Sequence, residues 1–441
     1  MVATFPDFAA AGAWYLMPLT DTVRYMRDRL PGLTLYVTST GAMVVALGAQ
    51  FIAFAILARH LGTAQFGQLQ TISATTEMAA ALSGVGAGET MTRRVARDLS
   101  MYPCVLGHGL ILLSTSGIAL TMFSAAGLSI FVKAGEDPLQ NILILLIMAG
   151  SNIILFKWIG FTEQVFLARQ LFLRANIVNM GFGLWRSGAT IAACLVFKVE
   201  TIWEWCLWYG AIHLAASAVC AMSVRRFGPP RWGILFEEIN RGFHLTTPFF
   251  FNILRQNIDL IAIGLISFPA TVGKYGAASR IATMSLVTVH SFNRLLYPKL
   301  ARAGRYGLST TFGLAVKYVV PATALAIATS AFVFILAPCA PLLFGTEYAD
   351  MVVYLRMLCW IPILVAIQNA IYDALGAADL HAMRAIVYNA GCIFASMLIL
   401  GLTWLWGLPG TVAGIYISQA SIAIALWITG YVMRQNVVAW R

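Results

Sequence analysis

Long apolar stretches dominate this chain and leave few folds open to it. A helix that crosses a membrane needs about 20 mostly apolar residues. Twelve stretches of that kind can be placed, at about 34–58, 66–88, 107–132, 139–160, 171–197, 203–224, 244–268, 276–297, 312–336, 353–376, 384–407 and 411–434. Only 11% of the 441 residues are charged, against about a quarter in soluble domains. The sequence therefore predicts an all-α polytopic membrane protein with about twelve transmembrane helices.

The distribution of Lys and Arg predicts the orientation of these helices. Basic residues concentrate in the cytoplasmic loops of membrane proteins. Of the 29 Lys and Arg residues, 20 fall on one set of alternate connections. The opposite side holds only Arg59, Lys133, Lys198, Lys274 and Arg356. This asymmetry predicts that both termini lie in the cytoplasm.

The same pattern predicts how the chain is divided. We expect a cytoplasmic or interfacial segment at 1–33, a first six-helix lobe at 34–226 and a cytoplasmic inter-lobe loop at 227–242. A second six-helix lobe at 243–434 and a cytoplasmic tail at 435–441 follow. The net charge of +11 does not indicate nucleic-acid binding, because the basic residues are scattered between apolar runs. The seven cysteines show neither metal-ligand spacing nor a disulfide framework, so we expect no metal site.

Polar residues interrupt three of the predicted helices in a regular way. One face of the seventh helix carries Asn252, Arg255, Gln256 and Asp259, at i, i+3, i+4 and i+7. The eighth helix carries Arg280, Thr283, His290 and Arg294 on one face, and the second carries Ser73, Thr76 and Glu77. An Arg or Asp facing lipid at mid-membrane costs ~2.5–3.5 kcal/mol. These faces therefore predict the lining of a hydrophilic cavity.

A plainer explanation of the seventh-helix stripe is also open. Arg255 and Asp259 are spaced i,i+4, so they could neutralise each other and hold helices together. Arg280 is expected near the outer end of its helix and Arg294 near the inner end, where either could reach a lipid headgroup. The sequence leaves open whether Arg186 and His290 face the cavity.

The chain contains an internal echo. The connection LARHLGTAQFGQLQTISAT at 57–75 aligns with SFPATVGKYGAASRIAT at 267–283 when Gly67 is placed on Gly273. Both connections leave an odd-numbered helix on the outer side, six helices apart. This spacing predicts two parallel repeats, an arrangement in which transporters place their substrate site between the repeats.

Several segments resemble a known family. They are LARHLGTAQFG at 57–67, VGKYGAASRIATM at 272–284 with LYPKLAR downstream, and APLLFGTEYADMVVYLRML at 340–358 followed by ALGAADLHAMRAIVYNAG. Over about residues 35–434 the chain is similar to the polysaccharide flippases of the multidrug, oligosaccharidyl-lipid and polysaccharide (MOP, MATE-like) exporter superfamily. The resemblance implies two six-helix lobes around a central cleft, alternating access, and a monomer.

The resemblance also implies a function. We expect a transporter, not an enzyme, that flips an undecaprenyl-pyrophosphate-linked oligosaccharide across the bacterial inner membrane for surface polysaccharide synthesis. Its partners would be the lipid bilayer, a polysaccharide polymerase and glycosyltransferases. The expected binding residues are Arg255 and Arg294 for the pyrophosphate, Gln256, Asn252 and Glu77 for sugar hydroxyls, and Arg280 for release. No cofactor is expected, although Asp259 or Glu77 could couple transport to an H⁺ or Na⁺ gradient.

The first helix departs from two branches of the superfamily. Lipid II flippases carry arginines there and proton-coupled drug exporters often carry a carboxylate, whereas residues 34–58 contain neither. Two alternatives remain open at this point. One is a MATE-like exporter of drugs or other small cations, with Glu77 as its acidic group, and the other is a non-transporting membrane scaffold of a glycan-assembly complex.

Overall fold

A computed structural model describes residues 19–439 of the chain. Within this range the chain is helical, with short connections and no strand. The helices in chain order are α1 Leu19–Leu82, α2 Ala87–Arg97, η3 Leu99–Met101, α3 Tyr102–Ser129, α4 Pro138–Gly150, η4 Ser151–Leu155, α5 Phe156–Ala168, α6 Phe172–Leu195, α7 Ile202–Arg225, α8 Phe236–Ile266, α9 Pro269–Gly304, α10 Leu308–Leu336, η5 Ala337–Cys339, α11 Ala340–Phe344, η6 Thr346–Tyr348, α12 Met351–Leu358, α13 Ile361–Ala377 and α14 His381–Ala439.

The lengths and composition of these helices confirm a multi-pass membrane protein. Eight helical segments of the described range are long and apolar enough to span a membrane. Helices α6 and α9 are also long, with 24 and 36 residues. Sharp kinks at Gly62 (φ 68°) and Gly407 (φ 62°) divide α1 and α14 into two helical segments each. The architecture is therefore compatible with the twelve spans predicted from the sequence.

Several element boundaries differ from those predicted. Helix α1 already begins at Leu19, so much of the segment expected at 1–33 is helical, and residues 1–18 lie outside the described range. Helix α8 begins at Phe236, inside the loop expected at 227–242. Helix α9 begins at Pro269 and not near 276, because a proline in the first turn is compatible with a helix start. Helix α14 runs on to Ala439, into the expected tail, and 440–441 are not described.

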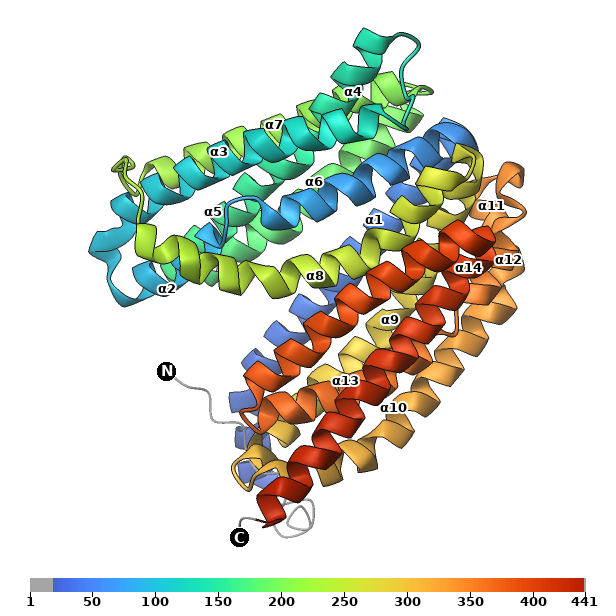
Figure 1. The fold of residues 1–441 in the computed structure, drawn as a ribbon. Helices are drawn as coiled ribbons and strands as arrows, with labels where there is room; N and C mark the ends of the chain where they lie inside the picture. The colour runs from blue at the N-terminus through green and yellow to red at the C-terminus, as the bar shows by residue number, and fades with distance from the viewer. Residues whose placement is uncertain (1–18, 440–441) are drawn as a thin grey trace.

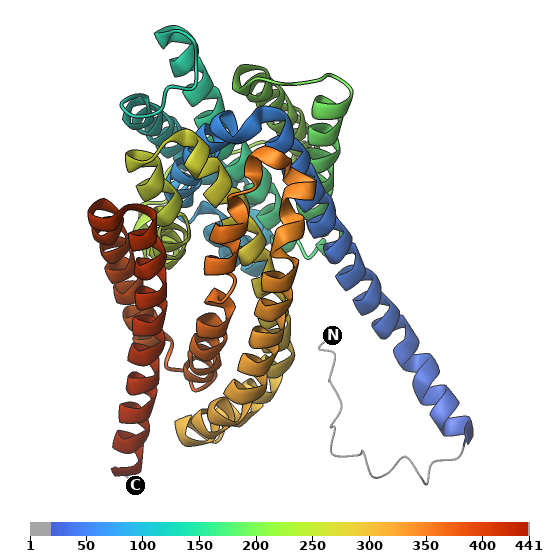
Figure 2. The ribbon, with the colours of Figure 1, turned by 90° about the vertical axis from the view of Figure 1, so that its right-hand side faces the viewer.

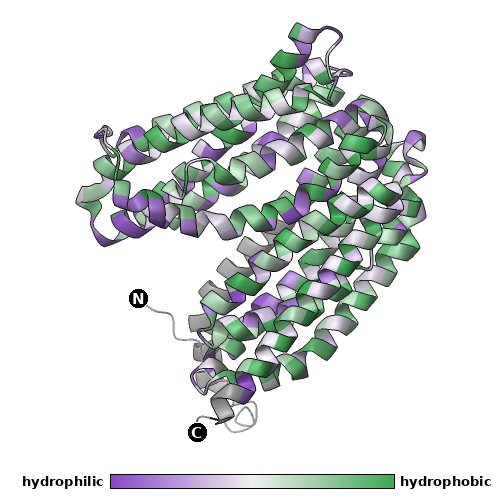
Figure 3. Ribbon diagram, viewed as in Figure 1, coloured by the Kyte–Doolittle hydropathy of each residue, from purple (hydrophilic) through white to green (hydrophobic). Residues whose placement is uncertain are grey.

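The helices form two arms that converge at one end and separate at the other (Figure 1). One arm contains α2 to α7 with the second part of α1, and the other contains α9 to α14. Figure 2 shows the first part of α1 as a long helix at the side of the molecule. Hydrophilic residues gather at the free end of the first arm, around α2, and between the arms, while apolar residues dominate the helices elsewhere (Figure 3).

The largest hydrophobic core lies where the arms converge and draws on both halves of the chain. It includes Phe66, Tyr275 and Tyr348, each 1% exposed or less. The hydroxyl of Tyr348 donates a hydrogen bond to the carbonyl of Ala58, 2.9 Å away. Smaller apolar clusters stabilise the two arms separately nearer their free ends. The convergent end is thus the place where the halves are joined most extensively.

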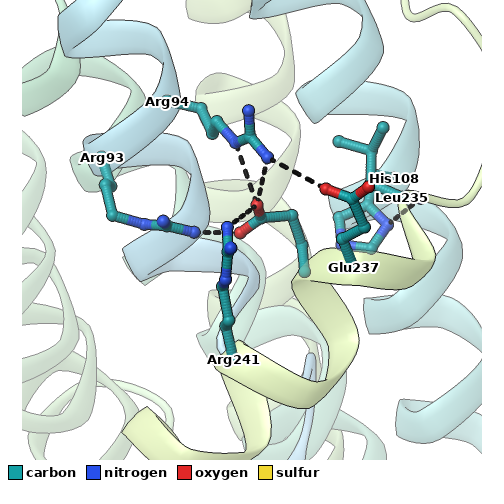
Figure 4. Close-up of polar contacts among 7 residues, drawn as sticks. Arg93, Arg94, His108, Leu235, Glu237 and Arg241 are labelled. Atoms are coloured by element: carbon teal, nitrogen blue, oxygen red, sulfur yellow. Dashed lines mark hydrogen bonds and ion pairs between the residues drawn. The ribbon is translucent and has the colours of Figure 1, made fainter.

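Helix α8 is attached to the first half of the chain at its start. Glu238, whose side chain is fully buried, accepts hydrogen bonds from Arg93 and from Arg94 of α2, with Arg94 Nη2 at 2.5 Å (Figure 4). Arg241 lies 3.4 Å from the same carboxylate. The imidazole of His108 on α3 accepts a hydrogen bond from the backbone N–H of Leu235 at 3.1 Å. The start of α8 is therefore held by α2 and α3.

Candidate functional site

A cavity of about 660 Å³ lies between the two halves of the chain. Its walls come from α1, α6, α7, α8, α9, α12, α13 and α14. Lining side chains such as Glu77, Gln256 and Arg280 are exposed to solvent. Polar side chains within membrane-spanning helices face protein or water, because contact with lipid is costly for them. The cavity therefore has the hydrophilic lining that the polar stripes predict.

Six of the seven predicted site residues line this cavity: Asn252, Arg255, Gln256, Asp259, Glu77 and Arg280. Arg294 does not line it and has an exposed side chain. It lies 14 residues beyond Arg280 on the same helix, about 21 Å along the axis at 1.5 Å per residue. Sharing a helix face with Arg280 therefore does not bring Arg294 into the cavity.

The predicted position of Arg280 near the outer end of its helix is wrong. Because α9 begins at Pro269, Arg280 is 11 residues from that end, or about 16 Å along the helix axis. Its guanidinium group lies 5.8 Å from the ring centroid of Phe54 on α1, within the range of a cation–π contact. Arg280 thus lies well inside α9 and lines the cavity.

The ion pair proposed between Arg255 and Asp259 does not form. Arg255 Nη2 lies 3.5 Å from the side-chain oxygen of Asn252 and 3.5 Å from the hydroxyl of Tyr388 on α14. Asp259 accepts a 2.7 Å hydrogen bond from the hydroxyl of Tyr275 on α9. Among the described residues, no carboxylate lies within ion-pairing distance of Arg255. Its positive charge therefore remains available to a ligand.

Glu77 shares the cavity lining with two guanidinium groups, those of Arg186 and Arg280. Neither arginine forms an ion pair with the Glu77 carboxylate within 4.0 Å. Arg186 on α6 was left open by the sequence, as was His290 on α9, and both line the cavity. With Arg255 and Asp259, the lining holds three guanidinium groups against two carboxylates, so it favours an anionic ligand.

Other lining residues are not among those predicted from the sequence. Tyr209 on α7 lines the cavity and donates a 2.6 Å hydrogen bond to Asn152. Asn152 in turn donates to the hydroxyl of Thr76 at 2.8 Å. Asn152 lies in η4, a π-helical turn between α4 and α5, and such turns are frequent at functional sites. This network joins three helices on the first-half side of the cavity.

The remaining polar groups lie on the second half of the chain. Helices α13 and α14 contribute Gln368, Asn369, Tyr388, Ser418 and Gln419 to the lining. Their only signal in the sequence is an amide or hydroxyl side chain within a long apolar window. Among the described residues, no three His, Cys, Asp or Glu side chains are arranged to hold a metal ion. The cavity can therefore offer cationic groups together with many hydrogen-bond donors and acceptors.

Comparisons with known proteins agree with this architecture. A family model described as "Polysaccharide biosynthesis protein" matches residues 35–303. No curated protein sequence matches the chain. An inward-facing multidrug resistance MATE family transporter of the MOP superfamily is similar in structure, with a TM-score of 0.70, 17% identity, and coverage of 89% of this chain and 94% of that one.

Two further solved structures share the fold. The lipid II flippase MurJ in an inward closed conformation has a TM-score of 0.68 at 11% identity, covering 89% of this chain and 87% of its own. An outward-facing MATE family transporter has a TM-score of 0.56 at 18% identity, covering 90% and 96%. At such identities the likeness establishes the fold alone.

Proposed function

Since the chain belongs to the polysaccharide biosynthesis protein family, we propose that it flips a lipid-linked oligosaccharide across the bacterial inner membrane. The cargo would be an undecaprenyl-pyrophosphate-linked glycan bound for surface polysaccharide. The observation that carries this proposal is the cavity between the two halves, where three arginines and a set of amide side chains line one space. A pyrophosphate attached to sugars needs both kinds of group.

The distribution of Lys and Arg residues supports one orientation of the protein in the membrane. The five residues on the basic-poor side are each adjacent in the chain to a residue of the core where the arms converge: Arg59, Lys133, Lys198, Lys274 and Arg356 neighbour Ala58, Val132, Val199, Tyr275 and Leu355. The free ends carry α2 with its arginines and the C-terminal part of α14. Basic residues favour the cytoplasmic side, so the arms open toward the cytoplasm. A lipid-linked glycan made on that side can then enter the cavity from the inner leaflet.

Binding would start at Arg255, because its guanidinium group has no carboxylate partner among the described residues and suits phosphate oxygens bidentately. Arg186 and Arg280 add positive charge to the same cavity. Gln256 and Asn252 would donate hydrogen bonds to sugar hydroxyls, while the polyprenyl tail stays in lipid. Rocking of the halves about their convergent end would then open the cavity to the other side, with no bond made or broken. This protein would be a transporter and not an enzyme.

Two alternatives fit the cavity less well. An exporter of organic cations would have to place its positively charged cargo beside three arginines. Of the carboxylates in the lining, only that of Glu77 is exposed and could attract such a cargo. A scaffold that only uses the polar stripe to join helices would be expected to pair Arg255 with Asp259, and these two side chains bind other groups. Coupling to an H⁺ or Na⁺ gradient is part of our proposal, with Glu77 as the titrating group.

Complementation of a flippase-deficient bacterial strain tests the proposal. The wild-type chain should restore surface glycan, provided that the strain makes a matching lipid-linked oligosaccharide. Arg255→Ala should lose most of this activity at unchanged membrane expression, because a charge-assisted hydrogen bond is worth ~1.5–3 kcal/mol. Arg255→Lys keeps the charge without the bidentate fork and should be intermediate. Normal surface glycan from a well-expressed Arg255→Ala protein would contradict the proposal.

A further inference from the structure

The cavity has two chemically different walls. The acidic and basic side chains of its lining come from α1, α6, α8 and α9, and they include Glu77, Arg186 and Arg280. The residues contributed by α12 to α14 carry no charge. They combine the apolar side chains of Ile361 and Val365 with amides and hydroxyls. A ligand that fills the cavity therefore meets charge on one side and neutral hydrogen-bonding groups on the other.

Two glutamines of the neutral wall are buried without hydrogen-bond partners. Gln368 on α13 is 4% exposed and Gln419 on α14 is 5% exposed. The Oε1 atom of each accepts no hydrogen bond from any described residue. Leaving such a group unsatisfied costs about 1–3 kcal/mol, so a buried amide normally has a partner. Because both side chains line the cavity, the partner they lack is one that enters it.

We propose that this neutral wall, formed by Gln368, Gln419, Asn369 and Ser418, is a carbohydrate subsite for an uncharged sugar with hydroxyl or acetamido groups. A side-chain amide offers two donors and one acceptor oxygen, which matches the mixed donors and acceptors of such a sugar. Ile361 and Val365 cover the apolar C–H surface of the ring. The inference rests on the proposed function, since it divides the same cargo between a phosphate side and a sugar side.

The division has a consequence for recognition. The charged groups come from α1, α6, α8 and α9, whereas the two unpartnered glutamines come from α13 and α14. A sugar-free polyprenyl pyrophosphate would fill only the charged side. The cargo therefore makes its full set of contacts only when its first sugar is present, and this would prevent the carrier lipid from being transported without its glycan.

Binding of two synthetic lipids to purified protein in nanodiscs tests the subsite. The probes are undecaprenyl pyrophosphate and the same lipid carrying one N-acetylglucosamine. The wild type should bind the sugar-bearing lipid roughly tenfold more tightly, the value expected for one or two added hydrogen bonds. The double variant Gln368→Leu/Gln419→Leu should bind both lipids equally, with its affinity for the sugar-free lipid unchanged. Since leucine replaces unpartnered amides at similar volume, this variant should be at least as stable as the wild type.

A matched control lies on the same helix. Thr411 and Thr403 of α14 are buried, hydrogen-bonded to each other at 2.9 Å and absent from the cavity lining. Thr411→Val should therefore keep the tenfold preference. Equal binding of the two lipids by the wild type, or a preference retained in the double variant, overturns the subsite. Arg255→Ala separates the two ideas: if it binds both lipids normally, the phosphate role fails while the sugar preference still reports on α13 and α14.

Discussion

Gly67 and Gly273, the two residues that align in the internal repeat, pack backbone against backbone where the arms converge. A Cβ atom added to Gly67 would lie 1.7 Å from the carbonyl oxygen of Pro269 and 2.8 Å from the nitrogen of Gly273. A Cβ on Gly273 would lie 2.2 Å from the carbonyl oxygen of Thr63. The contact therefore requires glycine at both positions, and it joins equivalent points of the two halves.

Gly67→Ala and Gly273→Ala should each force the second part of α1 away from α9. We expect a loss of ~1–3 kcal/mol in stability, as for other overpacked sites, and a large fall in transport because the convergent end no longer closes. Thermal unfolding in detergent and surface-glycan complementation measure the two effects. Gly127→Ala is the control, since its Cβ would meet nothing within 4 Å. Wild-type stability and transport in Gly67→Ala would contradict the close contact.

Glu238→Gln should loosen the start of α8 from α2. The substitution removes the buried carboxylate that Arg93, Arg94 and Arg241 share, and charge-assisted hydrogen bonds of this kind are worth ~1.5–3 kcal/mol. A lower unfolding temperature and faster hydrogen exchange at 236–242 would be the measured results. The neighbouring Glu237 has a side chain 83% exposed and lies 3.9 Å from Arg94, so Glu237→Gln should change little. Equal effects of the two substitutions would rule out the buried cluster as the attachment.

Tyr275→Phe should destabilise the protein by ~1–3 kcal/mol, because it leaves the buried carboxylate of Asp259 without its 2.7 Å hydrogen bond. Tyr297 on the same helix α9 has a side chain 42% exposed, so Tyr297→Phe is the matched control and should be neutral. Chemical or thermal unfolding of the purified variants measures the difference. Indistinguishable unfolding of the two variants would show that Asp259 does not depend on Tyr275.

Glu77 and Asp259 should differ in their effect on energy coupling. Glu77 is exposed to the cavity, whereas Asp259 is 7% exposed and already hydrogen-bonded to Tyr275 and to the N–H of Leu260. Flipping in proteoliposomes should therefore lose its dependence on an imposed H⁺ or Na⁺ gradient in Glu77→Gln. In a folded Asp259→Asn protein the dependence should persist. The reverse pattern would assign the titrating role to Asp259.

The sequence could predict those features that depend on helix periodicity. The spacing of Asn252, Arg255, Gln256 and Asp259 sets one face of a helix whatever surrounds it, and all four line the cavity. The echo that aligned Gly67 with Gly273 also corresponds to a physical contact. In the first case the spacing of residues along one helix makes the prediction possible, and in the second the similarity between two segments of the chain does so.

Features that depend on tertiary contacts could not be predicted in this way. The i,i+4 spacing of Arg255 and Asp259 allowed an ion pair, but Tyr388 and Tyr275, from other helices, bind the two groups. The predicted depth of Arg280 is wrong because residues 269–275, which lie between two predicted spans, form the start of α9. Gln368 and Gln419 show no periodicity with other polar residues, so only their burial beside the cavity identifies them.

Helix α8 contacts different halves of the molecule before and after Pro248. Before this proline, Glu238 binds α2 of the first half, and after it Asn252 accepts a 2.9 Å hydrogen bond from Tyr388 of the second half. The connection ahead of the helix is also fixed, because the N–H of Arg231 donates to the carbonyl of Pro103 at 2.8 Å. The segment that joins the two repeats is thus held by these contacts and is not a loose linker. Rocking of the halves, as proposed above, would therefore bend α8 near Pro248, because a proline inside a helix interrupts its backbone hydrogen bonds.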